Sequence, residues 1–142
     1  MAPRAERRLL QAIVMLASIV PLSMGGLSVL RGADVLKGMD PPFPVDLDSH
    51  YRYLSGLLLG IGIVFVSTIP RIERHRTIFL TLGVVVFTGG LARLWSLAEA
   101  GPPSGGHLFG LAMELVAVPL IVLWQGRVAR QCSDKTTIAP PA

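Results

Sequence analysis

Four long apolar segments constrain this chain more strongly than any other feature of its sequence. They cover about residues 9–30, 50–69, 77–98 and 107–126. At a rise of about 1.5 Å per residue, helices of these lengths cross most or all of the roughly 30 Å hydrocarbon core of a bilayer. Backbone N–H and C=O groups cannot stay unpaired in lipid, so segments this long must be helices. The sequence therefore predicts an all-α integral membrane protein.

Composition and charge support this interpretation. Of the 142 residues, 51% are hydrophobic and only 15% are charged, which is too apolar for an ordinary soluble domain. The formal net charge is +4, but nearly all basic residues lie outside the apolar segments, so we expect no nucleic-acid partner. Cys132 is the only cysteine, which excludes an intramolecular disulfide and a cysteine-based metal site.

The connections and flanks predict the topology. Residues 70–76 and 99–107 are short connections, so neighbouring helices must be antiparallel. Three basic flanks fall on one side of the resulting four-helix bundle, and they contain Arg4, Arg7, Arg8, Arg71, Arg74, Arg76, Arg127, Arg130 and Lys135. The opposite side carries Arg31, Lys37 and Arg52 against Asp34, Asp40, Asp46, Asp48 and Glu99. The positive-inside rule then places both termini in the cytoplasm.

These features divide the chain into three parts. Residues 1–8 form a basic cytoplasmic N-terminus, 9–130 the membrane domain, and 131–142 a disordered cytoplasmic tail. The expected location is a membrane that the chain crosses several times, with its basic flanks in the cytoplasm. An alternative interpretation makes residues 1 to about 26 a cleaved signal peptide, although the apolar run is longer than a usual signal sequence.

Two charged residues interrupt the apolar segments. Arg93 precedes the outer end of the third segment by about five residues, and Glu114 follows the outer start of the fourth by about six, so both lie at a similar depth. Charged groups within a membrane are costly and normally have a partner. We therefore expect a salt bridge between Arg93 and Glu114, which either belongs to a functional site or only fixes the register of two helices.

Several polar and small residues accompany this pair. His107, Gly110, Glu114 and Gln125 share one stripe at 100° per residue. Asp48 and Ser49 are good N-cap residues for the second helix, and Pro70 should end it. Glycines gather in the outward half of the segments, where they permit either close helix packing or a cavity. The expected packing positions are Gly56, Gly60, Gly89, Gly90 and Gly110.

A cavity at that level would contain two positive charges and one negative charge, which favours an anionic ligand. The candidate ligand-binding residues are Arg52, Arg93, Glu114, His107, His50 and Tyr53. Tyr51, Tyr53, Trp95 and Trp124 fit the aromatic belts of membrane proteins, and Pro21 and Pro119 are expected to kink their helices. The sequence has no phosphate-binding loop, nucleophile elbow or metal-ligand cluster, so we name no catalytic residue, cofactor or metal and favour a non-enzymatic function.

Three stretches resemble a known family: DSHYRYLSGLLLGIG at residues 48–62, GGLARLWSL at 89–97 and ELVAVPLIVLWQGRVA at 114–129. They look like the small bacterial membrane proteins catalogued as domain of unknown function 4345, and more distantly like four-helix proteins of the DoxX type. The resemblance implies a four-helix, multi-pass protein of the bacterial cytoplasmic (inner) membrane and no particular activity.

We weigh three functions. The first is binding of a lipid head group or a small anionic or amphipathic molecule in an outward-facing polar pocket. The second is oligomeric transport of a small molecule, or proton-coupled transport through Glu114. The third is an accessory subunit of a larger membrane complex, or a membrane enzyme in which His50, His107 or Glu114 acts as acid or base at the outer interface. Expected partners are membrane lipids, with a second copy or another membrane protein as alternatives.

Overall fold

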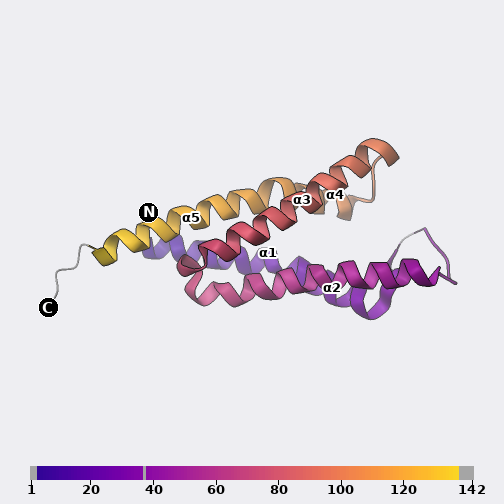
Figure 1. The fold of residues 1–142 in the computed structure, drawn as a ribbon, viewed down its shortest axis with the longest axis horizontal. Coiled ribbons are helices and arrows are strands. Elements are labelled where there is room, and N and C mark those ends of the chain that lie inside the picture. Colours follow the sequence, from indigo (N-terminus) through magenta and orange to yellow (C-terminus); the bar gives the residue numbers. More distant parts are fainter. Residues whose placement is uncertain (1–2, 37, 138–142) are drawn as a thin grey trace. The chain divides into compact units, whose positions relative to one another are not determined.

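The computed structural model describes residues 3–36 and 38–137. All elements in this part of the chain are helical (Figure 1). In chain order they are α1 (Pro3–Arg31), η1 (Gly32–Val35), α2 (Val45–Thr68), η2 (Ile69–Arg74), α3 (Arg76–Ala100), α4 (Gly105–Ala112), η3 (Met113–Ala117) and α5 (Val118–Thr137). Elements α4, η3 and α5 follow one another without a break and form one long helical segment.

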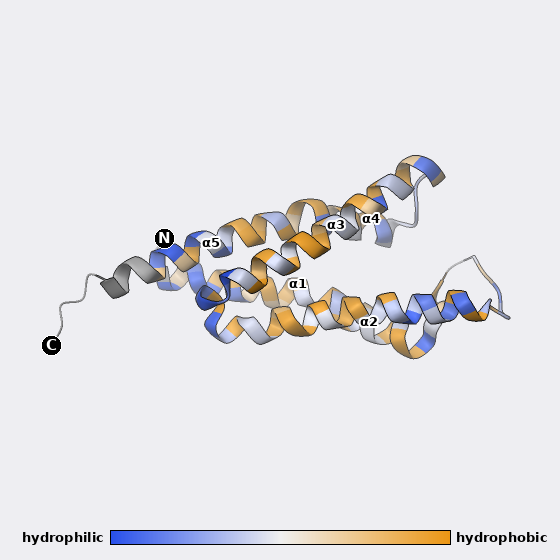
Figure 2. Cartoon of the chain, viewed as in Figure 1, coloured by the Kyte–Doolittle hydropathy of each residue, from blue (hydrophilic) through white to orange (hydrophobic). Residues whose placement is uncertain are grey.

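The predicted all-α fold is confirmed. Four helical segments are long and apolar enough to cross a membrane, namely Arg4–Val35, Val45–Arg74, Arg76–Ala100 and Gly105–Cys132. Each contains one predicted apolar run and extends beyond it into polar residues, because a helix continues as long as its backbone groups can pair. Figure 2 shows this for α2, whose N-terminal turns are hydrophilic and whose middle is hydrophobic.

The chain separates into two units. The first, called here the hairpin unit, is Ala12–Pro70, and the second, called the three-segment unit, combines Met1–Gln11 with Arg71–Ala142.

In the hairpin unit, α1 and α2 run antiparallel at close distance. A Cβ atom placed on Gly25 would lie 2.8 Å from the backbone nitrogen of Leu59, and one on Gly62 would lie 3.2 Å from the side chain of Leu22. Residue numbers thus rise on one helix as they fall on the other. Any larger side chain at Gly25 would meet the backbone of α2, so this glycine permits the close approach.

The start of α2 differs from the prediction. The helix begins at Val45, with Pro44 as its N-cap residue and no side-chain capping bond. Asp48 and Ser49 were expected as caps but lie within the first turn or two of the helix. Asp48 instead accepts a hydrogen bond from the backbone of Ala33 in η1, which no local capping pattern could reveal. The predicted end is confirmed, since the α-helix stops at Thr68, two residues before Pro70.

In the three-segment unit, α3 packs against η3 and α5 (Figure 1). The buried side chains include Ile72, Phe79, Val122 and Val128. A Cβ atom on Gly83 would lie 2.7 Å from Val122, so this glycine marks a second close approach between antiparallel helices. The packing of α3 on α5 is therefore held by apolar contacts around small residues.

A π-helical segment, η3 (Met113–Ala117), interrupts the fourth helical segment and ends two residues before Pro119. Proline has no N–H group and its ring collides with the carbonyl group four residues earlier, which here belongs to Leu115. The N–H of Val118 donates to the carbonyl of Met113, five residues back, and the widened turn makes room for the ring. The expected disturbance at Pro119 thus takes the form of a π turn.

The C-terminal part of the chain is helical further than expected. Residues 131–142 were predicted to be disordered, but α5 continues through Thr137. Residues 138–142 lie outside the described part. At the other end, α1 already begins at Pro3 within the basic segment 1–8.

Candidate functional site

The expected ion pair between Arg93 and Glu114 is present in the three-segment unit. Helix α3 supplies Arg93 and the π turn η3 supplies Glu114. The Nε atom of Arg93 lies 3.2 Å from Oε2 of Glu114, and the two side chains are 42% and 18% exposed. The glutamate is thus the more buried partner, while the arginine side chain remains partly accessible.

The ion pair is not a well-aligned hydrogen bond. Oε2 of Glu114 is buried and has no hydrogen-bond partner among the described residues, although it lies close to Nε of Arg93. The distance permits strong Coulomb attraction, whereas the angle does not permit the shorter and stronger charge-assisted bond. The pair is consequently held by charge and by the packing around it.

Gly90 explains how α3 comes near the π turn. A Cβ atom on Gly90 would lie 2.7 Å from Cδ2 of Leu115 and 3.0 Å from Cβ of Glu114. Arg93 follows Gly90 by three residues and therefore lies on the same side of α3. A small residue on one helix and a widened turn on the other thus bring the two charges together.

A small hollow of about 90 Å³ lies next to this ion pair. Its lining residues come from α3, from the following connection and from α4, and they are Arg93, Ser96, Leu97, Pro103, His107 and Leu111. The volume suffices for several water molecules or one small polar group. Arg93 and His107, two of the predicted ligand-binding residues, therefore line one space.

His107 has a local partner. Its Nδ1 atom lies 2.9 Å from the hydroxyl oxygen of Ser104, the N-cap residue of α4. If the hydroxyl group donates this bond, the neutral ring carries its proton on Nε2 and can donate to a ligand. The contact holds the exposed imidazole beside the start of α4.

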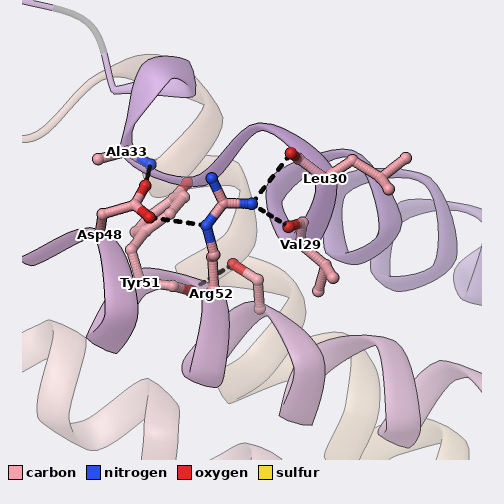
Figure 3. A network of polar contacts seen from close by, with 7 residues as sticks. Val29, Leu30, Ala33, Asp48, Tyr51 and Arg52 are labelled. Atoms are coloured by element: carbon pink, nitrogen blue, oxygen red, sulfur yellow. Dashed lines mark hydrogen bonds and ion pairs between the residues drawn. The ribbon is translucent and has the colours of Figure 1, made fainter. Parts of the chain in front are cut away.

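Arg52 has a different environment in the hairpin unit (Figure 3). Its Nε atom donates to Oδ2 of Asp48 at 2.7 Å, and Nη1 donates to the carbonyl oxygens of Val29 at 2.6 Å and Leu30 at 3.0 Å. The other oxygen of Asp48, Oδ1, accepts the N–H of Ala33 at 2.7 Å. One arginine and one aspartate thus bind the last turn of α1 and the turn after it.

This network changes the interpretation of Arg52. The sequence grouped it with Arg93 and Glu114 as a ligand-binding cation, but its charge is balanced by Asp48 and two of its donors are used by carbonyl groups that α1 cannot pair itself. His50 and Tyr53, also predicted for the site, are exposed on α2, with ring centroids 6.5 Å apart. The structure places these three residues in the hairpin unit and Arg93, Glu114 and His107 in the other.

The predicted packing glycines differ in their surroundings. Gly90 lies at a close helix contact, and Gly56 and Gly110 are near side chains at about 4 Å. A Cβ atom on Gly60 or Gly89 would meet nothing within 4 Å in the described structure. The other close approaches occur at Gly25, Gly32, Gly62, Gly83 and Gly126, which the small-xxx-small pattern did not select.

A second polar cluster, in the three-segment unit, was not predicted. Gln125 is fully buried and donates to the carbonyl of Ile72 at 2.8 Å. Nη1 of Arg76 donates to the carbonyl of Val122, and its guanidinium group packs where a Cβ of Gly126 would lie. A glutamine following an apolar run was the available signal, but its partner could not be read from the sequence.

The N-terminal turn of α1 joins the same cluster. Glu6 is buried and accepts a hydrogen bond from Nε1 of Trp124 at 3.0 Å, while Arg127 pairs with it at 3.1 Å. Arg7 pairs with Glu73 at 2.9 Å. Trp124 was interpreted only as a belt residue. The two glutamates within otherwise basic segments were the signal for these contacts.

An all-α chain with four helical segments of this length and apolarity, and with an arginine–glutamate pair joining two of them, has the characteristics of a multi-pass membrane protein. The chain belongs to the family described as domain of unknown function (DUF4345), whose model matches residues 9–125. No curated protein and no solved structure matches it. In the described part of the chain, no group of three histidine, cysteine, aspartate or glutamate residues could hold a metal ion.

Proposed function

We propose that this chain is a multi-pass protein of the bacterial inner membrane, with both termini in the cytoplasm, that binds a small anionic or amphipathic molecule beside Arg93. The ligand chemistry is a phosphate or carboxylate group, carried either by a lipid head group or by a soluble metabolite. The hollow next to Arg93 and His107 would receive that group. The basic flanks described above support the orientation.

The observation that carries this proposal is the incomplete pairing of Arg93. Its Nε atom faces Glu114, but no hydrogen bond from its two Nη groups to a protein acceptor is found among the described residues. An arginine within a span is costly, by about 2.5–3.5 kcal/mol on insertion scales, unless its donors are satisfied. A planar guanidinium group with unused donors is well suited to bind phosphate or carboxylate in a bidentate manner.

The neighbouring residues fit the same chemistry. His107 can donate from Nε2 when Ser104 donates to Nδ1, and Ser96 adds a hydroxyl group to the lining. Leu97 and Leu111 supply apolar surface beside these polar groups, which suits an amphipathic molecule. Glu114 competes with an anionic ligand for the guanidinium group of Arg93, and its negative charge also repels such a ligand.

Two substitutions with opposite expected effects on ligand retention test the proposal. We expect Arg93→Gln to reduce ligand retention about tenfold or more, since a charge-assisted bond is removed. Glu114→Gln should preserve or increase retention, because it frees Arg93 from a competing carboxylate. The measurement is native mass spectrometry of protein released from its own membranes, and the bound mass distinguishes a lipid from a soluble anion. Arg31→Gln, at an exposed position in the last turn of α1, is the matched control.

A purely structural ion pair predicts another pattern. Both substitutions would then lower thermal stability by similar amounts and change no bound mass. Loss of a bound species in both variants, or in neither, would contradict the proposed role of Arg93 as the binding cation.

A further inference from the structure

We infer that the basic end of the three-segment unit binds the head groups of anionic phospholipids. Basic end here means the described segments 3–11, 71–76 and 124–132. The inference goes beyond the proposed ligand site and rests on the proposed membrane insertion and orientation. Its basis is that the structure separates the arginines used within the fold from those that remain available.

Three of the arginines at this end have partners in the protein. Arg7 pairs with Glu73, and Arg127 pairs with Glu6. Arg76 is directed into the unit, where it donates to the carbonyl of Val122. These contacts tie the first turns of α1 to η2 and to α5, and the start of α3 to α5.

The remaining arginines are exposed. Arg4, Arg8, Arg71, Arg74 and Arg130 form no ion pair in the described structure, and each has an accessible side chain. Both glutamates of these segments are already paired. Eight arginines and two glutamates therefore leave six positive charges at this end.

Their position along the chain indicates a lipid surface rather than another acidic partner. Arg8 directly precedes the apolar run that starts at Leu9, and residues 71–76 connect two apolar segments. Figure 2 shows hydrophilic residues at the N-terminal end of α1 and at the start of α3. Trp124 at the same end has a bonded indole N–H and an apolar ring, as in residues of the membrane interface.

Guanidinium groups at the ends of the apolar segments would lie at the depth of the lipid phosphate groups. Arginine binds phosphate in a bidentate manner, and basic residues close to a membrane attract anionic lipids within a Debye length of the surface. A cluster of five exposed arginines is large enough to select anionic over zwitterionic head groups. The surface therefore fits phospholipids with net negative charge.

The test uses purified protein in nanodiscs made from equal amounts of phosphatidylglycerol and phosphatidylcholine, where orientation in the cell plays no part. Lipids that remain bound on release are counted by native mass spectrometry. We expect phosphatidylglycerol to be enriched on the wild-type protein. The Arg71→Gln/Arg74→Gln double variant should reduce this enrichment about tenfold at low salt and leave thermal stability nearly unchanged.

Two controls make the result specific. Arg76→Gln should lower thermal stability but keep the lipid preference, because Arg76 acts within the fold. Arg31→Gln should change neither. The inference would be overturned if phosphatidylglycerol enrichment on the double variant stayed within twofold of the wild-type value. It would also be overturned if Arg31→Gln lowered the enrichment as much as the double variant does.

Carbonate extraction of native membranes separates this inference from the proposed function. If the protein is released by carbonate, the membrane proposal itself fails. If it is retained but shows no preference for phosphatidylglycerol, only the lipid-binding surface is rejected. The species lost in Arg93→Gln is measured separately in the same spectra.

Discussion

Arg52 closes the end of α1 from a position on the next helix. The last carbonyl groups of a helix have no partner within it, and Nη1 of Arg52 binds those of Val29 and Leu30. Gly32 has a φ of 62°, and a Cβ atom there would collide with Asp48 and Arg52. A glycine in the left-handed region is therefore required where the chain turns beneath this network.

The bonds to carbonyl groups should contribute more than the ion pair. Arg52 is 41% exposed and its pair with Asp48 is solvated, so the charge pair adds little. We expect Arg52→Gln to lower the free energy of unfolding by about 1–2 kcal/mol, through two lost charge-assisted bonds. Thermal unfolding in detergent micelles measures the change.

Arg52→Lys should show part of this loss, since a lysine lacks the planar fork. Arg31→Gln removes the same charge from an exposed site and should leave the midpoint unchanged. Equal midpoints for Arg52→Gln and Arg31→Gln would show that the network does not stabilise the hairpin unit.

At the residue scale, the sequence predicted one ion pair but not the hydrogen-bond partners of other polar residues. Arg93 and Glu114 were recognisable because each is an isolated charge in an apolar run. Their similar depth in the predicted membrane was enough to predict that they pair. Arg52 could be paired with Asp48 from the spacing of four residues, but its bonds to Val29 and Leu30 depend on how α1 and α2 pack. Gln125 was likewise visible, while its acceptor on Ile72 was not.

Among the helices, the paired glycines of α3 show how closely the elements approach. Gly89 and Gly90 are adjacent in sequence, yet only Gly90 faces η3. A glycine that meets nothing only weakens a helix, whereas one at a contact sets the distance between two helices. The two positions therefore make a matched pair.

Alanine should have opposite effects at these two positions. We expect Gly89→Ala to raise the free energy of unfolding by about 0.5–1 kcal/mol, because alanine is the better helix former. Gly90→Ala should lower it by about 1–3 kcal/mol, because its Cβ overpacks against Glu114 and Leu115. Denaturation of the two variants in the same micelles provides the measurement.

If alanine stabilised the protein at both positions, η3 would have to shift away from residue 90 without a cost in free energy. A destabilising effect at both would mean that Gly89 contacts a group that the described structure does not contain.

For the elements, helical periodicity predicted four segments but not their irregularities. Apolar runs specify where a helix must be, while its ends depend on polar flanks that contain no such signal. Pro119 indicated a disturbance in the fourth segment, but the π turn is one of several ways to accommodate a proline. The stripe from His107 to Gln125 assumed a constant 100° per residue, which does not hold across η3.

On the scale of the whole chain, the orientation is the prediction with the widest consequences, because the Arg93 hollow and the basic end would face opposite compartments. Single cysteines in a Cys132→Ser background test it. We expect Asp40→Cys, in the connection between α1 and α2, to react with an impermeant maleimide on intact cells. Ala5→Cys, near the start of α1, should react only after the membrane is permeabilised, since the basic flanks are retained inside.

Both positions are exposed in the structure, so a missing reaction cannot be attributed to burial in the protein. Labelling of both residues on intact cells, or of Ala5→Cys alone, would refute the proposed topology.

The fold class followed from the sequence because apolar runs of this length leave few alternatives to a helix. The two units, by contrast, follow from contacts between distant segments, such as Glu6 with Trp124 and Arg127. Glu6 lies more than 100 residues from these partners along the chain, and hydropathy contains no information on such pairs.

The π turn also affects how the fourth segment can be aligned with its neighbour. Its residues near α3 include Gly110, then the adjacent Glu114 and Leu115, and then Val122 and Gly126. The last three recur at intervals of seven and four, as in a regular α-helix, whereas two adjacent residues of η3, four and five positions after Gly110, both meet Gly90. The turn thus absorbs the equivalent of a one-residue insertion, and α4 and α5 keep the same neighbour although no single helical wheel represents both.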